Sequence, residues 1–147
     1  MMKIQALALN YEAALAKLMC ELWPESRIEE EQAYLLSIRQ SEVDAFFLLM
    51  DDEGPQGFIQ LKVRSDYVEG AQTSPIAYVE GLYVRTAFRR KGWAAKLIQQ
   101  AESWAKEKGL NQLASDTEIS NLSSINFHTQ AGFTEANRIV CFIKDLD

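Results

Sequence analysis

The residues best suited to chemistry lie in one short turn between a predicted strand and a predicted helix: Arg89, Arg90, Lys91, Gly92, Trp93, Ala94 and Ala95. The small residues among them let a ligand approach the backbone closely. The first N–H groups of a helix have no partner within it, and the helix dipole adds positive charge at the same place. Together with three basic side chains, these groups make the turn a candidate pyrophosphate site, although its pattern is neither a Walker motif nor GxGxxG.

The strand before this turn contains a glycine in the run Glu80-Gly81-Leu82-Tyr83-Val84. A glycine inside a strand predicts a bulge or a close approach of another group to the backbone. A bulge would splay this strand from its neighbour, so the backbone of Leu82 and Val84 could pair with an extended amide ligand. A ligand that joins an amide chain to a pyrophosphate has the chemistry of coenzyme A.

The elements that must position these groups follow from apolar periodicity and from turn residues. Helices are predicted from Asn10 to about Leu22, from Glu29 to about Gln40, from Trp93 to Lys108, and from Ser120 or Asn121 to about Gln130. Strands are predicted at Ile4–Leu9, Ala45–Met50, Gly57–Arg64, Ile76–Val84 and Leu113–Ser115, with one or two more within Thr134–Lys144. This order predicts an α/β protein with a mixed sheet and helices on its faces.

Length and charge limit the remaining choices. The 147 residues, 48% hydrophobic and 24% charged, suit one domain over residues 1–147 without a membrane-spanning segment. The net charge of −6 disfavours nucleic acid as a partner. The first 80 residues hold 14 acidic and 6 basic residues, a balance that favours a cationic ligand. Cys20, Cys141 and the single His128 fit no metal spacing, and the two cysteines suit the reducing cytoplasm.

Two segments resemble motifs of the GCN5-related N-acetyltransferase superfamily. The pattern Arg89-x-x-Gly92-x-Ala94 after a strand resembles its acyl-CoA-binding motif, and the stretch from Asn121 to Phe133 resembles its second half. The resemblance implies a central, mostly antiparallel sheet splayed at a bulged strand, with helices on both faces. It also implies that acetyl-CoA is bound by Leu82, Tyr83, Val84, Arg89, Arg90, Lys91, Gly92, Trp93, Ala94, Ala95 and Asn121.

Within that superfamily the chain is similar to the bacterial aminoglycoside 6'-N-acetyltransferases. The similarity rests on Leu22-Trp23-Pro24, Asp66–Gly70, Thr73-Ser74-Pro75, Glu80–Val84 and Ala114–Thr117, which occur in the same order. It implies transfer of an acetyl group from acetyl-CoA to the 6'-amine of an aminoglycoside such as kanamycin or tobramycin. No residue has the setting of a covalent nucleophile in a triad, so we expect direct transfer, without a metal. The similarity further implies a homodimer, in which the apolar stretch Ile139–Ile143 could pair or swap between two copies.

The same resemblance implies which residues bind the acceptor: Trp23, Tyr67, Glu80, Asp116 and Asn137. Carboxylates pair with ammonium groups, and aromatic faces pack on sugar rings. Glu80 could orient the 6'-amine or take its proton through water. Asn137 stands where the subgroup tends to carry an acid before an arginine and an apolar stretch, which weakens the expected contact with the far rings.

His128 occupies the position at which many superfamily members carry a tyrosine proposed to protonate the leaving thiolate. Imidazole could donate that proton, or it could hold the helix or contact the cofactor. Because a thiolate is already stable near neutral pH, we favour the packing role.

Two other functions stay open on sequence alone. One is acetylation of a different amine, such as a polyamine or a protein N-terminus, and the other is acyl-CoA sensing without turnover. A peptide acetyltransferase has no obvious need for both Glu80 and Asp116, and a sensor needs neither.

Overall fold

The computed structural model describes residues 1–147 and contains one five-stranded sheet with the order β1-β2-β3-β4-β5. The strands are β1 (Lys3–Ala6), β2 (Asp44–Asp51), β3 (Gly54–Arg64), β4 (Ile76–Val84) and β5 (Leu113–Ala114). The first four are antiparallel to their neighbours, and β5 runs parallel to β4.

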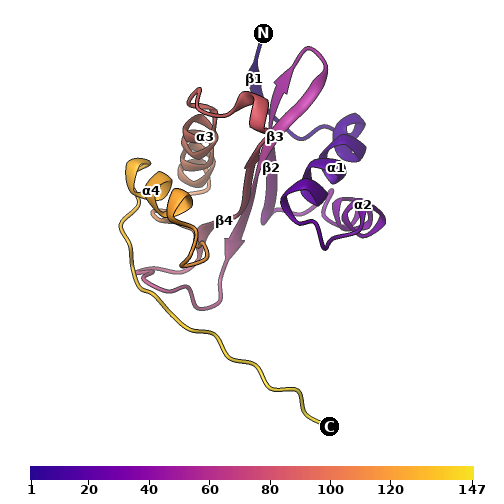
Figure 1. The fold of residues 1–147 in the computed structure, drawn as a ribbon. Coiled ribbons are helices and arrows are strands. Elements are labelled where there is room, and N and C mark those ends of the chain that lie inside the picture. Colours follow the sequence, from indigo (N-terminus) through magenta and orange to yellow (C-terminus); the bar gives the residue numbers. More distant parts are fainter.

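Helices cover both faces of this sheet (Figure 1). On one side lie α1 (Glu12–Leu22) and α2 (Ile28–Ser37), and on the other lie α3 (Trp93–Glu107) and α4 (Leu122–Gln130). Each face of the sheet has its own hydrophobic core, and alternate residues of β2 contribute to one or the other. Leu48 and Met50 pack with α1 and α2, whereas Leu49 packs with α3. The predicted fold, a mostly antiparallel mixed sheet with helices on both faces, is confirmed. No helix has both the length and the hydropathy needed to cross a membrane.

The predicted bulge lies in β4 at Glu80. Gln60 of β3 is opposite Gly81, and Leu61 is opposite Val79, so Glu80 is the extra residue. The extra residue changes the phase of the strand, because the side-chain alternation has a period of two.

The change of phase is visible in the packing. Before the bulge, Ala77 and Val79 face α3; after it, Leu82 and Val84 do. Pairing with β5 involves only Ala77 and Tyr78, so β4 diverges from β5 beyond that point.

Position 81 needs a glycine because the side chain of Trp23 packs directly against its backbone. A Cβ atom at this position would lie 2.7 and 2.8 Å from two indole carbons of Trp23, the residue that follows α1. The indole also packs near the ring of Phe58, with 6.1 Å between centroids. Trp23 is therefore fixed against the bulged part of β4.

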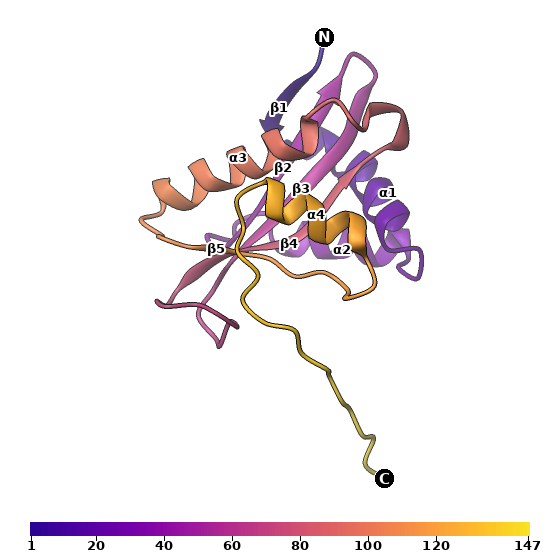
Figure 2. The same ribbon diagram turned by 60° about the vertical axis from the view of Figure 1, so that its left-hand side comes forward.

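The prediction of strands within Thr134–Lys144 is wrong. Residues 134–147 have no regular secondary structure and extend away from the body of the protein (Figures 1 and 2). A strand needs a neighbour for its backbone hydrogen bonds, and one copy of the chain offers none here. The exposed apolar side chains of this segment are Ile139, Val140, Phe142, Ile143 and Leu146.

The other differences concern the ends of elements. The first strand stops at Ala6, because residues Leu9–Tyr11 form a 3-10 turn that leads into α1. The second helix covers Ile28–Ser37 rather than Glu29–Gln40. Such ends depend on local caps and are the least regular part of an element.

Candidate active site

The basic turn before α3 has the geometry of an anion site. Gly92 is the N-cap of α3 with a φ of 84°, and no side chain caps the helix. Arg90 also has a positive φ, 62°. Residues in the left-handed region bring successive backbone N–H groups toward one concavity, at the positive end of the helix dipole. The side chains of Arg90 and Lys91 are exposed beside it.

Arg89 differs from its neighbours in the turn, because its side chain folds back on β4. Its Nε donates a hydrogen bond of 2.5 Å to the carbonyl oxygen of Val84. Its guanidinium carbon lies 5.7 Å from the centre of the Tyr83 ring. Arg89 therefore joins the end of β4 to the turn, and the backbone oxygen of Val84 already has a partner.

The edge of β4 beyond the bulge carries Leu82, Tyr83 and Val84. Because β5 pairs only as far as Tyr78, these three residues have no strand partner on that side. The Tyr83 hydroxyl donates to Glu21 of α1 over 2.9 Å, so its side chain points to the α1 face. The Arg85 N–H donates a hydrogen bond to the Gln56 carbonyl oxygen across the β3 side, so by strand alternation the backbone of Tyr83 also faces β3, and the backbone groups of Leu82 and Val84 face the free edge.

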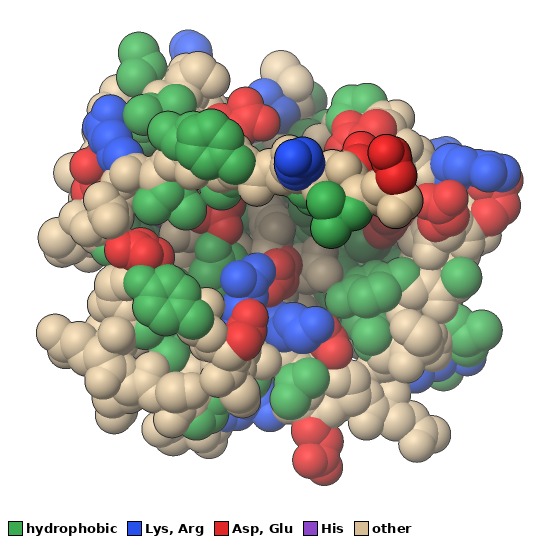
Figure 3. Space-filling model, turned by 90° about the horizontal axis from the view of Figure 1, so that it is seen from below, with side chains coloured by type: hydrophobic (Ala, Val, Ile, Leu, Met, Phe, Trp, Pro, Cys, Tyr) green, Lys and Arg blue, Asp and Glu red, His purple; other side chains and the backbone are tan.

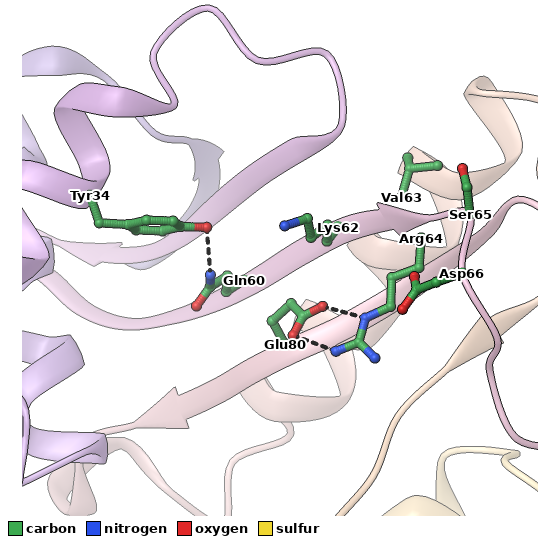
Figure 4. A pocket seen from close by; sticks show the side chains of 8 residues that line it. All are labelled: Tyr34, Gln60, Lys62, Val63, Arg64, Ser65, Asp66 and Glu80. Atoms are coloured by element: carbon green, nitrogen blue, oxygen red, sulfur yellow. Dashed lines mark hydrogen bonds and ion pairs between the residues drawn. The ribbon is translucent and has the colours of Figure 1, made fainter. Parts of the chain in front are cut away.

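The structure connects Glu80 to Asp116 through two residues that the sequence analysis did not identify. Arg64 of β3 donates from Nε and Nη2 to the two carboxylate oxygens of Glu80, each over 2.8 Å (Figure 4). The Arg64 guanidinium lies 3.5 Å above the centre of the Tyr78 ring. The Tyr78 hydroxyl donates to Asp116.

Glu80 and Arg64 line an open groove of about 600 Å³ between α2 and the sheet, with Tyr34, Gln60, Lys62 and Asp66. Acidic and basic side chains lie close together around the hollow of the face shown in Figure 3. Burial raises the pKa of Tyr34 to about 12. Burial and the bond to Asp116 also raise the pKa of Tyr78. Both tyrosine hydroxyls therefore stay neutral and donate hydrogen bonds. The charge of the groove comes from its carboxylates and bases.

Tyr67 and Asn137 form a separate contact. Tyr67, 80% exposed, donates from its hydroxyl to Glu69, and Asn137 Nδ2 donates to the same carboxylate over 3.0 Å. This contact joins the loop before β4 to the C-terminal segment. No hydrogen bond or ion pair connects it to Glu80.

His128 of α4 uses both ring nitrogens within the protein. Nδ1 lies 2.7 Å from the carbonyl oxygen of Ser124, which can only accept, so Nδ1 carries the proton. Nε2 lies 2.8 Å from Ser115 Oγ and, in the neutral ring, accepts from that hydroxyl. The ring also packs edge-on against Phe133, with 5.1 Å between centroids.

Asn121 is the N-cap of α4, and its side-chain oxygen accepts a hydrogen bond from the Ser124 N–H over 3.1 Å. Its side-chain amide group remains free to donate. The structure contains no group of three or more His, Cys, Asp or Glu that could share a metal ion.

The residues missed at the sequence level, Arg64 and Tyr78, had only a weak signal. Each lies two positions from a charged residue of its own strand, Lys62 and Glu80, and so shares a face with it. That spacing indicates a polar face but does not identify which charges pair.

Comparisons with known proteins agree with this geometry. The sequence model of the Acetyltransferase (GNAT) family matches residues 12–133. The chain is 41% identical over 138 residues to the aminoglycoside N(6')-acetyltransferase type 1 of Serratia marcescens, covering 93% of this chain and 94% of that protein. It is 36% identical to the enzyme of the same name from Acinetobacter baumannii, covering 88% of each.

Two solved structures are similar throughout. One is AAC(6')-Iy in complex with a bisubstrate analogue, CoA-S-monomethyl-acetylneamine, with a TM-score of 0.94, 32% identity and 99% of both chains covered. Another is AAC(6')-Ih from Acinetobacter baumannii, with a TM-score of 0.89, 32% identity and full coverage of both chains. The bulged and splayed β4, the glycine turn at the start of α3 and these similarities lead to one conclusion: the chain belongs to the GNAT family of acetyltransferases.

Proposed function

We propose that this protein transfers the acetyl group of acetyl-CoA directly to the 6'-amine of an aminoglycoside and thereby confers antibiotic resistance. Its relatives carry this activity in their names, and one similar structure is in complex with a bisubstrate analogue, CoA-S-monomethyl-acetylneamine. The observation in this chain that carries the proposal is the linked pair of carboxylates, Glu80 and Asp116, beside the free edge of β4.

Acetyl-CoA would bind between the free edge of β4 and the turn before α3. The pyrophosphate would accept hydrogen bonds from N–H groups near Gly92, with Arg90 and Lys91 adding charge. The amide chain would extend along Leu82–Val84 as an added strand. Asn121 would contribute its free side-chain amide group.

The acceptor would bind over the groove that Glu80 and Arg64 line. Glu80 and Asp116 would pair with ammonium groups, and Trp23 and Tyr67 would pack against sugar rings. Asn137 would contact the acceptor from the C-terminal segment. Glu80 would accept the proton of the 6'-ammonium, directly or through water.

The reaction then balances without a covalent enzyme intermediate. The neutral amine nitrogen attacks the thioester carbon, and an N–H near Leu82 stabilises the tetrahedral oxyanion. The C–S bond breaks and coenzyme A leaves as its thiolate, which takes up the proton that the nitrogen releases as the amide forms. Holding the two substrates together supplies much of the rate enhancement.

The proposal extends to assembly and location. The exposed apolar segment 139–146 would pair with or exchange between two copies, because an unpaired apolar strand is readily covered by a second chain. Free Cys20 and Cys141 suit the reducing cytoplasm.

The activity itself is tested by thiol release from acetyl-CoA with kanamycin, spermidine and a peptide as acceptors. We expect turnover with kanamycin above all. Glu80→Gln and Asp116→Asn should each lower kcat/KM about tenfold or more, because a charge-assisted contact is worth roughly 1.5–3 kcal/mol. Glu107→Gln is the control, since Glu107 is exposed at the end of α3, outside the groove. Wild-type kinetics in both variants would contradict the assignment.

The cofactor turn is tested by Gly92→Val. A β-branched residue at a φ of 84° is strained by roughly 1–3 kcal/mol and shifts the backbone N–H groups that would bind pyrophosphate. Calorimetry should show acetyl-CoA affinity reduced by about tenfold or more. Gly109→Val at the other end of α3 has a φ of 74° and equally open surroundings. It should lose similar stability and keep its affinity, and an unchanged affinity in folded Gly92→Val would refute the site.

His128 is tested by single-turnover rates and melting curves of His128→Ala. Because both nitrogens are bonded within the protein, we expect a stability loss of about 1–3 kcal/mol and less than a tenfold loss of rate. Ser115→Ala removes only the Nε2 partner and should give a smaller loss of stability. A rate loss of roughly 100-fold with an unchanged melting temperature would instead identify His128 as the general acid.

Light scattering tests the dimer. Wild-type protein should have the mass of two chains. The double variant with Val140→Asp and Phe142→Asp should have the mass of one, because burying unpaired charges in an apolar strand pair is costly. Leu36→Asp, an equally drastic change at an exposed position of α2, should leave the dimer intact. A monomeric wild-type protein would disprove this part of the proposal.

A further inference from the structure

We infer that Arg64 is a positioning residue, which holds the Glu80 carboxylate in the orientation needed for acetyl transfer rather than binding the acceptor. The inference rests on the proposed function, because Glu80 matters only if an amine binds there. It concerns a side chain on β3, the strand next to the one that carries Glu80.

The first observation is the double hydrogen bond. The two nitrogens Nε and Nη2 contact separate oxygens of Glu80, each over 2.8 Å, which fixes both the position and the plane of the carboxylate. The two side chains are only 29% and 21% exposed, so water screens the pair less than it screens surface ion pairs. Glu80 is the bulge residue of β4, and no opposite residue of β3 fixes its side chain.

The second observation is that Arg64 is itself fixed. Its guanidinium carbon lies 3.5 Å from the centre of the Tyr78 ring, and Tyr78 donates its hydroxyl hydrogen to Asp116. The chain Glu80–Arg64–Tyr78–Asp116 therefore sets the relative positions of two carboxylates that come from different elements. Nothing else in the hydrogen-bond network joins them.

The positive charge of Arg64 opposes the binding of a cationic acceptor. An ammonium group that approaches Glu80 also meets the guanidinium of Arg64, and like charges repel. Arg64 therefore weakens the ground-state binding of a polycation. Its benefit must lie in orientation, which appears in kcat, rather than in attraction, which appears in KM.

Thiol-release kinetics with kanamycin separate these effects. We expect Arg64→Gln to lower kcat by about tenfold or more, since a misplaced reacting group is costly, while KM does not rise. Arg64→Lys should show a similar loss of kcat, because a single ammonium keeps the charge but cannot hold both oxygens or stack on Tyr78. Acetyl-CoA affinity, measured by calorimetry, should stay at the wild-type value in both.

Arg39→Gln is the matched control. Arg39 makes the same double hydrogen bond, to Glu12, outside the groove. Its loss should lower the melting temperature about as much as Arg64→Gln does and leave kcat and KM unchanged. A drop in kcat with Arg39→Gln would show that ion-pair loss alone reduces activity, and would overturn the inference.

A double-mutant cycle shows whether Arg64 acts through Glu80. If it does, Arg64→Gln made in the Glu80→Gln background should change kcat by no more than about twofold. Independent, multiplicative losses would overturn the inference, as would a raised KM with unchanged kcat, or full activity of Arg64→Lys. Absence of turnover by the wild-type protein would overturn the proposed function and this inference with it; turnover by the wild type with unaffected Arg64 variants overturns the inference alone.

Discussion

The extra residue in β4 is the constraint on which the site depends. Without it, the alternation of β4 would place Leu82 and Val84 on the face of Tyr78, away from the α3 core. The bulge lets apolar residues before and after it contact the same core, and leaves Glu80 on the groove side. It also coincides with the end of pairing to β5. One irregularity thus produces the acidic side chain and the free backbone edge together, within a few residues.

Electrostatics divides the molecule in the way that two oppositely charged substrates require. The turn before α3 combines exposed bases with unpaired N–H groups, and the groove presents the carboxylates of Glu80 and Asp66. The groove is not simply acidic, because Arg64 and Lys62 lie within it. A site that must release an acetylated, less charged product gains from such a balance, since excess negative charge would tighten ground-state binding without accelerating the chemical step.

Several contacts hold distant segments around the site. Ser115 and His128 join the end of β5 to α4, Arg89 joins the turn to β4, and Trp23 packs on Gly81. Each fixes a segment next to β4 or β5. The C-terminal segment is the exception: it touches the body at Glu69 through Asn137 and then extends outward with its apolar side chains uncovered.

The sequence alone determined most of the framework. Periods of two and 3.6 residues predicted the strands and helices, Gly81 predicted the bulge, and Gly92 between basic residues predicted the turn, because these signals are local. It also singled out Glu80, Asp116 and His128. Only the tertiary structure decided what those side chains contact. The Arg64–Glu80 pair depends on the register of β3 and β4, and the bonds of His128 depend on how α4 packs on β5. The missing C-terminal strand has the same cause: a periodic pattern specifies a face, whereas a strand needs a neighbour, which no local pattern contains.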